Sequence, residues 1–191
     1  MIKLADLFDA SGRPVPLGHK LGSGGEGDVY EVTAIGPDLA AKIYHKPLKP
    51  DKQEKLRSMV QEGCDDSLKN IAAWPTATLH LGRNGPVRGF LMPKVVGCED
   101  IHKLYGPAHR KQLFPKADWA FLVNTARNVA AAFDAIHAHA RVIGDVNQSN
   151  IVVARNSVVQ LIDCDSFQVV ANGKPYLCEG GVLHHPSQLK L

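Results

Sequence analysis

The sequence predicts an α+β protein in two parts, an N-terminal antiparallel β-sheet with one helix and a C-terminal part that is mostly α-helical. Three observations support this prediction. Short β-prone runs separated by glycine fill the first part, residues 74–97 have the pattern of a hairpin, and residues 118–140 have the strongest helical periodicity in the chain. The composition changes after Pro93, so we expect domains at 1–93 and 94–191.

The N-terminal part is expected to contain one helix, over residues 49–63. Pro50 near its start and Gly63 at its end are typical of helix boundaries. Apolar residues recur between them at helical intervals: Leu56, Met59 and Val60. The two strands that follow are joined through Asn84-Gly85, a pair that favours a tight hairpin turn.

The C-terminal part is expected to be dominated by the helix over residues 118–140, with Asp118 as its N-cap. Apolar residues at helical spacing predict a broad buried face: Trp119, Leu122, Val123, Ala126, Val129, Ala130, Phe133 and Ile136. Two short β-like runs follow at 151–154 and 158–163, with a turn at 155–157 between them.

Composition excludes several classes of protein. The chain has 191 residues, 45% of them apolar, and a net charge of +3 without a dense basic stripe, which argues against nucleic-acid binding. No apolar run approaches the roughly 20 residues of a membrane span, and the N-terminus lacks a signal-peptide core. The spacing of the cysteines fits free thiols rather than a zinc site: Cys64, Cys98, Cys164 and Cys178. We therefore expect a cytoplasmic protein with no membrane or nucleic-acid partner.

A glycine-rich stretch near the N-terminus has the spacing of a phosphate-binding loop. Gly22, Gly24, Gly27 and Val29 form the pattern G-x-G-x-x-G-x-V. Glycine allows a backbone to approach phosphate closely, because no Cβ blocks the way. A dinucleotide-binding fingerprint needs a helix next and an acid about 20 residues on. Here a β-prone run follows, and Lys42 stands in the acid's place, which suits a cation that reaches nucleotide phosphates.

Lys42 lies in an apolar run, where an ammonium group needs a partner. Glu54 and Glu62, both on the expected helix, are the candidates for that partner. We favour Glu54, because the short loop after the lysine strand would bring the first turns of the helix nearest Lys42.

Three polar residues stand at the edges of apolar segments in the C-terminal part. Asp145 and Asn150 are five residues apart, and Asp163 follows the second β-like run. Burial of an ionised carboxylate without a partner is costly, and a divalent metal ion would satisfy all three side chains.

The order of these features resembles that of the protein kinase superfamily. "AAK" is similar to the strand motif that ends in the nucleotide-binding lysine, here Lys42. "GDVNQSN" resembles the catalytic loop, and "IDCD", led by Asp163, stands where the metal-binding D-F-G motif would be. The stretch 143–169 is similar to bacterial kinase-like proteins that carry helix-hairpin-helix segments, or that are encoded beside a von Willebrand A protein and a phosphatase.

The resemblance implies a bilobal kinase fold and a serine/threonine protein kinase that uses ATP and Mg²⁺. It assigns catalysis to Asp145, Lys42 and Glu54, and the metal to Asn150 and Asp163. It assigns nucleotide contacts to Gly22, Ser23, Gly24, Gly27, Val29, Ala40, Lys42, Met92, Pro93, Val95 and Asn150. The implied partners are a protein substrate with a serine or threonine hydroxyl, a phosphatase and a von Willebrand A protein.

The sequence departs from the family pattern in ways that leave other functions open. The arginine before the catalytic aspartate is Gly144, and the lysine two residues after it is Asn147. A kinase C-lobe continues well beyond the length seen here, so we expect a fragment or a minimal form. One alternative is a catalytically silent kinase-like module that binds nucleotide or a partner. Another is a small-molecule kinase of the aminoglycoside or choline phosphotransferase type, which shares the G-D-x-x-x-x-N pattern.

Overall fold

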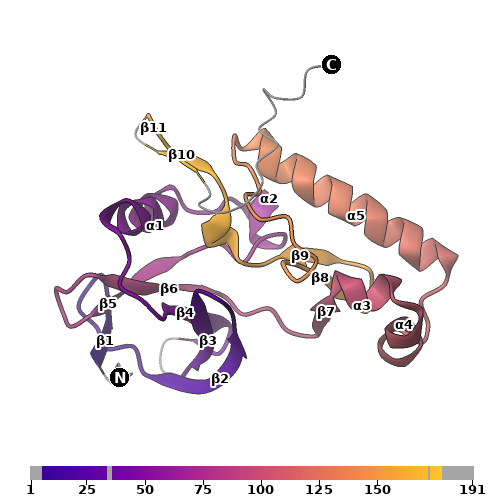
Figure 1. Ribbon diagram of the computed structural model, residues 1–191, viewed down its shortest axis with the longest axis horizontal. Coiled ribbons are helices and arrows are strands. Elements are labelled where there is room, and N and C mark those ends of the chain that lie inside the picture. The colour runs from indigo at the N-terminus through magenta and orange to yellow at the C-terminus, as the bar shows by residue number, and fades with distance from the viewer. Residues whose placement is uncertain (1–5, 34–35, 172, 178–191) are drawn as a thin grey trace. The chain divides into compact units, whose positions relative to one another are not determined.

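The computed structural model describes residues 6–33, 36–171 and 173–177, and the chain divides into two compact units (Figure 1). Unit 1 is Met1–Val96 and unit 2 is Gly97–Leu191. The sequence placed the boundary three positions earlier, after Pro93.

The described part of unit 1 contains a six-stranded antiparallel sheet with the strand order β1-β5-β6-β4-β3-β2. Its strands are β1 (Leu7–Asp9), β2 (Leu17–Ser23), β3 (Gly27–Val32), β4 (Leu39–Tyr44), β5 (Ala77–Leu81) and β6 (Val87–Pro93). The central strands β4 and β6 are buried along nearly their whole length. The antiparallel sheet expected from the sequence is thus present.

Side chains alternate between the two faces of a strand, and this alternation separates the core from the site. On β4, Ala41 and Ile43 face a hydrophobic core, so Lys42 between them points to the opposite face. The core on the first face consists of Leu7, Val15, Val32, Ala41, Ile43, Leu79 and Leu91.

The predicted helix is α1 (Pro50–Glu62), which lies next to β5 (Figure 1). Pro50 lies in its first turn, and Gly63 ends it with a φ of 69° and an N–H that donates to the Met59 carbonyl. Trp74 fixes the helix by donating its Nε1–H to the same carbonyl at 2.9 Å. A second, four-residue helix, α2 (Asp66–Lys69), was not predicted.

The hairpin between β5 and β6 is present, but its turn is longer than Asn84-Gly85 alone suggests. The Leu81 N–H donates to the Pro86 carbonyl at 3.2 Å, so the loop between them comprises residues 82–85. Gly82 adopts a φ of 78°, and a Cβ on Gly85 would lie 1.7 Å from the Leu81 carbonyl oxygen. Glycine is therefore favoured at position 82 by its positive φ and required at position 85 by the close contact.

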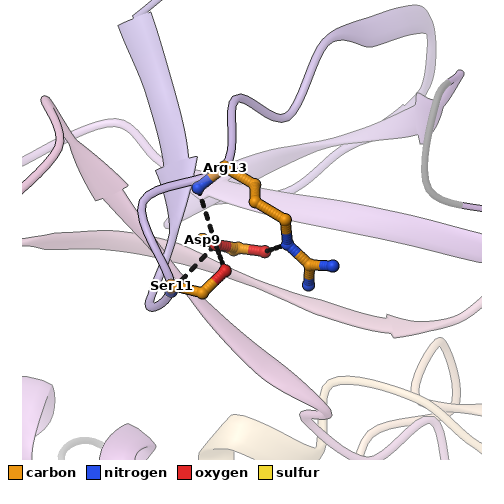
Figure 2. Close-up of polar contacts among 3 residues, drawn as sticks. All are labelled: Asp9, Ser11 and Arg13. Carbon is orange, nitrogen blue, oxygen red and sulfur yellow. Dashed lines mark hydrogen bonds and ion pairs between the residues drawn. The ribbon is translucent and has the colours of Figure 1, made fainter.

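The edge strand β1 was not predicted, and a compact polar turn follows it. Figure 2 shows Ser11 and Arg13 directed at the Asp9 carboxylate. Ser11 donates its backbone N–H and its hydroxyl at 2.9 and 2.6 Å. Arg13 donates its backbone N–H and its Nε–H at 3.0 and 2.8 Å. These bonds satisfy a carboxylate whose residue is only 4% exposed.

The described part of unit 2 combines three helices with short strands. The helices are α3 (Ile101–Tyr105), α4 (Pro107–Leu113) and α5 (Trp119–Ala138), with a 3₁₀ turn η2 (Cys164–Ser166). The strands β7 (Cys98–Asp100), β8 (Ile151–Ala154) and β9 (Val159–Leu161) form one antiparallel sheet, and β10 (Val169–Ala171) pairs with β11 (Lys174–Tyr176). The predicted hairpin is β8–β9, and its turn contains Ser157 at a φ of 67°.

The long helix α5 begins where the sequence indicated, because the Asp118 carboxylate accepts the Phe121 N–H at 2.8 Å. It lies along β9 (Figure 1), and Asn128 donates to the Ser157 carbonyl at 2.8 Å.

The predicted buried face of α5 is only partly present in the described part of the chain, where Leu122, Val129 and Phe133 are half-buried and Ile136 is buried. Trp119 is 78% exposed and Val123 is 49% exposed. The buried residues of the helix are Thr125, Ala132 and Ile136. Spacing shows which residues share a face, but burial also needs a neighbouring element, and the described residues cover only part of this helix.

The sequence predicted free cysteine thiols and no membrane-spanning helix. Cys64, Cys98 and Cys164 are present as thiols, and Cys178 lies outside the described residues. Within the described ranges, no helix has both the length and the apolar character needed to cross a bilayer.

Candidate active site

The glycine motif forms the turn between β2 and β3. The Gly24 N–H donates to the Gly27 carbonyl at 2.8 Å, and Ser23 pairs with Asp28 at the base of the turn. The residues after the motif continue as strand β3, as expected, and do not form the helix of a dinucleotide-binding fold.

Packing within the protein explains only one of the three motif glycines. A Cβ on Gly27 would lie 2.5 Å from the Ile43 carbonyl oxygen, so no larger residue fits there. A Cβ on Gly22 would meet nothing within 4 Å, and on Gly24 only the Gly27 carbonyl at 3.6 Å. Neither of these two adopts a positive φ. At such open positions, one physical reason for glycine remains: it lets a ligand such as a phosphate approach the protein backbone closely.

The strand register gathers several predicted nucleotide-binding residues on one face of the sheet. Val29 is paired with Lys42, and Ala40 with Met92, across neighbouring strands. Because Ala40 and Lys42 are two residues apart on β4, all four side chains share the face opposite the hydrophobic core. An apolar floor next to a cation suits a base and its phosphates.

Lys42 is the buried cation of this face, with a relative exposure of 6%. Its Nζ lies 5.4 Å from the centroid of the Tyr44 ring and 5.9 Å from that of Phe90. Both rings can stabilise its ammonium group through cation–π interactions.

The helix α1 carries both glutamates that were candidates for pairing with Lys42. Glu54 and Glu62 are exposed, whereas Lys55 is buried together with Leu56 and Met59 on the packed side of the helix. The assignment of Glu54 as the partner of Lys42 stays a prediction.

The segment expected to contact adenine follows directly from β6. Pro93 is the last residue of the strand and pairs with Leu39. Val95 is half-buried. Between them, Lys94 donates its N–H to the Asp38 carbonyl at 2.7 Å and its Nζ contacts Glu31 at 2.6 Å. The backbone here is therefore held against the strand end, while the adenine contacts themselves stay predicted.

One polar cluster of unit 1 was missed from the sequence. Asp28, the residue after the last motif glycine, contacts Ser23 at 2.6 Å, Lys20 at 2.7 Å and His45 at 3.1 Å. Hydrogen bonds from Lys20, then Ser23 and His45, hold the pKa of the Asp28 carboxyl far below its usual range. The available signal was an acid inside a phosphate-loop motif, where a negative charge is unexpected.

In unit 2, Asp145 and Asn150 contact each other directly. Asn150 donates its Nδ2–H to the Asp145 carboxylate at 3.0 Å and to the Asp145 carbonyl at 3.2 Å. The loop between them is closed by backbone bonds from Asn147 to Asp145 and from Asn150 to Asn147. Because its amide nitrogen is turned to Asp145, the Asn150 side-chain oxygen remains as an acceptor for another group.

Asp163 lies at the same end of the β8–β9 hairpin as Asn150. The Ile162 N–H donates to the Asn150 carbonyl at 3.0 Å. Because Asp163 directly follows Ile162, this bond places the backbone of Asp163 near Asn150. Asp163 has a φ of 60° and a ψ of 37°, a left-handed conformation uncommon outside glycine. Such conformations are retained where the surroundings enforce them, often at functional sites.

Asn150 and Asp163 carry the kinds of donor atom that suit a magnesium ion. An amide oxygen and a carboxylate are the hard oxygen ligands that Mg²⁺ prefers, and it keeps waters at its other positions. Among the described residues, no group of three or more His, Cys, Asp or Glu side chains could hold a metal ion. A site of few protein ligands, completed by water and phosphate oxygens, is the kind that these residues could form.

Two named proteins are similar to this chain over most of its sequence. Over 178 residues, the chain is 52% identical to "Protein kinase YegI" of Escherichia coli O157:H7 and 51% identical to the protein of that name in strain K12. Over most of its own length, this chain is therefore similar to proteins named as protein kinases. The matched segment is 93% of this chain and 27% of each relative, so the chain spans about a quarter of their length. No protein-family model matches the sequence.

Solved structures establish the kinase fold. The ROP18 kinase domain in complex with AMP-PNP and sucrose matches with a TM-score of 0.60 at 15% identity, over 90% of this chain and 62% of that chain. A Toxoplasma gondii rhoptry antigen kinase domain matches with a TM-score of 0.57 at 16% identity, over 84% of this chain and 54% of that chain. The predicted fold class, a kinase fold with an antiparallel sheet and one main helix in its N-terminal part, is confirmed.

Proposed function

We propose that this chain is the nucleotide-binding part of a protein kinase that transfers a phosphoryl group from ATP, with Mg²⁺, to a serine or threonine hydroxyl. The observation that carries the proposal is the shared sheet face of Val29, Ala40, Lys42 and Met92, beside glycines whose side of the loop is open. An apolar face, a buried ammonium group and an exposed backbone turn are what a nucleotide triphosphate needs.

In this proposal unit 1 binds the nucleotide. The backbone N–H groups of the glycine loop bind phosphate oxygens, because Gly22 and Gly24 leave them accessible. Lys42 holds the α- and β-phosphates as a fixed charge that needs no reorganisation during transfer. The adenine edge is read by the Pro93 carbonyl and the Val95 N–H.

Unit 2 supplies the groups for transfer. Asn150 and Asp163 hold Mg²⁺, which when bound neutralises charge on the phosphates. Asp145 accepts a hydrogen bond from the acceptor hydroxyl and orients it for in-line attack. The Asn150 amide keeps the Asp145 carboxylate in one orientation through the 3.0 Å bond. Most of the catalysis is therefore positioning and charge neutralisation.

Binding of magnesium-loaded AMP-PNP to the full chain, measured by calorimetry, tests this function. We expect Lys42→Ala to weaken affinity at least about tenfold, or roughly 1.4 kcal/mol. Lys69→Ala is the matched control, because Lys69 is an exposed lysine of the same unit that pairs with Asp66. Its affinity should equal that of the wild type.

Asp163→Asn tests the metal ligands in the same assay. We expect this variant to lose the dependence of nucleotide affinity on Mg²⁺, whereas Asp134→Asn, on the exposed side of α5, keeps it. A wild type without magnesium-dependent affinity, or one that matches Lys42→Ala, would contradict the proposed function.

A second function, a nucleotide-binding module without turnover, is favoured by one observation. Asn147 stands where kinases carry a cationic phosphate contact, and its Oδ1 instead accepts the Ser149 N–H at 2.9 Å. Radiolabelled ATP with protein acceptors separates the two functions, since only the enzyme labels them. The association with a phosphatase and a von Willebrand A protein stays a prediction.

A further inference from the structure

A single carboxylate connects the strands at the base of the glycine loop. One Asp28 oxygen contacts Ser23 Oγ at 2.6 Å, Lys20 Nζ at 2.7 Å and His45 Nε2 at 3.1 Å. The other oxygen accepts the Tyr30 hydroxyl at 3.3 Å. Lys20 and Ser23 belong to β2, Tyr30 to β3, and His45 follows β4. Asp28 thus joins the strand that enters the loop to the two strands behind it.

The backbone ladder at this point is irregular, so the side-chain contacts matter more than usual. The register between β2 and β3 shifts twice, between Leu17 and Lys20 and between Lys20 and Gly22. A bulged ladder leaves backbone groups unpaired and a strand easier to displace. By contrast, β3 and β4 pair without a shift. The irregular ladder is therefore that of β2, and the Asp28 carboxylate holds β2 through the side chains of Ser23 and Lys20.

By its charge alone, the Asp28 carboxylate should disfavour phosphate binding at the neighbouring glycine loop. A carboxylate beside a phosphate-binding loop repels phosphate, and in the wild type the ammonium group of Lys20 offsets this repulsion. Simple electrostatics therefore predicts that removing the carboxylate strengthens nucleotide binding. A role in ordering the loop predicts the opposite sign, because a mobile loop must lose entropy when the ligand binds.

We propose that Asp28 is a positioning residue that holds the glycine loop in its nucleotide-binding conformation through Ser23 and Lys20. This inference rests on the proposed function for the effect on affinity. The effect on loop order does not depend on it.

The test compares full-length wild type, Asp28→Ala, Ser23→Ala and the double variant. Calorimetry gives the affinity for magnesium-loaded AMP-PNP, and amide hydrogen exchange gives the order of residues 22–27 without nucleotide. We expect Asp28→Ala to weaken affinity at least fivefold and to speed exchange at Gly24, whose N–H bonds to Gly27. The double variant should lose less than the product of the two single losses, since both remove one contact.

Asp9→Ala is the matched control for a merely structural role. Asp9 is also a carboxylate of unit 1 held by a hydroxyl, an arginine and backbone N–H groups, but it lies in the turn after β1. We expect Asp9→Ala to lower thermal stability while leaving affinity and exchange of residues 22–27 unchanged.

Each outcome decides the proposal. Unchanged or tighter nucleotide binding by Asp28→Ala, with wild-type exchange at residues 22–27, overturns it. Loss of affinity in Asp9→Ala equal to that in Asp28→Ala also overturns it, because general destabilisation would then suffice. If the wild type binds no nucleotide, the proposed function fails, and the exchange rates alone decide whether Asp28 orders the loop.

Discussion

At the scale of single residues, glycine has two different roles in the same motif. Gly27 is fixed by the fold, because the Ile43 carbonyl oxygen lies where its Cβ would be. Gly22 has open space around it and no positive φ, so the fold itself would accept a side chain there. A motif read from sequence treats both positions alike, and only the packing separates them.

This difference predicts opposite behaviour for two alanine substitutions. Gly27→Ala should destabilise the protein by about 1–3 kcal/mol, because backbone atoms must shift to admit a methyl group. Gly22→Ala should leave stability within about 1 kcal/mol of the wild type, since alanine also restricts the unfolded chain. Chemical denaturation measures both. Nucleotide affinity should be more sensitive to Gly22→Ala than stability is, because ligand approach is the reason given for this glycine. A Gly22→Ala protein that binds AMP-PNP as the wild type does would remove that reason.

Polar residues of the site were recognisable because each is unusual in its surroundings. A lysine within an apolar strand and an aspartate after an apolar run are both costly without partners, so the sequence indicated Lys42 and Asp163. Asp28 was missed although an acid inside a phosphate-loop motif is unexpected, because residue type alone does not reveal its partners. Its contacts to Ser23 and His45 depend on strand register, which a sequence does not display.

At the scale of elements, helix boundaries were predicted well and helix burial poorly. Local rules decide the ends of α1 and α5, through Pro50, Gly63 and Asp118. Burial depends on neighbours distant in sequence. Of the apolar stripe expected on α5, Ile136 is fully buried and Trp119 is mostly exposed within the described structure.

The effects of alanine substitutions along α5 on stability should follow this pattern of burial. Ile136→Ala should destabilise the protein by about 2–4 kcal/mol, because it leaves a cavity at a residue with 0% exposure. Val123→Ala, at 49% exposure, should cost less than about 0.5 kcal/mol. Urea unfolding of the chain compares the two. Equal losses would show that the exposed side of α5 is covered by another part of the chain in solution.

At the scale of the whole molecule, acid stability depends on carboxylates whose pKa the fold lowers. Burial raises the pKa of Asp9, but hydrogen bonds from Ser11 and Arg13 outweigh it and lower the pKa from 3.8 to about 2. A lowered pKa stabilises the folded state above pH 3.8, and this stabilisation is lost as the pH falls towards 2.

The stability of Asp9→Ala should therefore vary less with acid pH than that of the wild type. Near neutral pH the variant should be less stable by roughly 1–3 kcal/mol, because the donors of Ser11 and Arg13 lose their acceptor. Between pH 4 and pH 2 the two stabilities should converge, since the wild type loses the same contribution by protonation. Denaturant titrations at several pH values measure this, and a constant difference down to pH 2 would contradict the assignment to Asp9.

The sequence by itself determined the order of the motifs and the ends of the main helices, and it indicated the candidate site residues. These are local properties, set by residue type and by spacing along the chain. Only the tertiary structure decided which residues share a sheet face, that Asn150 turns its amide to Asp145, and that Asp28 joins strands at the base of the glycine loop. Such contacts depend on strand register and packing, because they join residues whose separation in sequence says nothing of their distance in space.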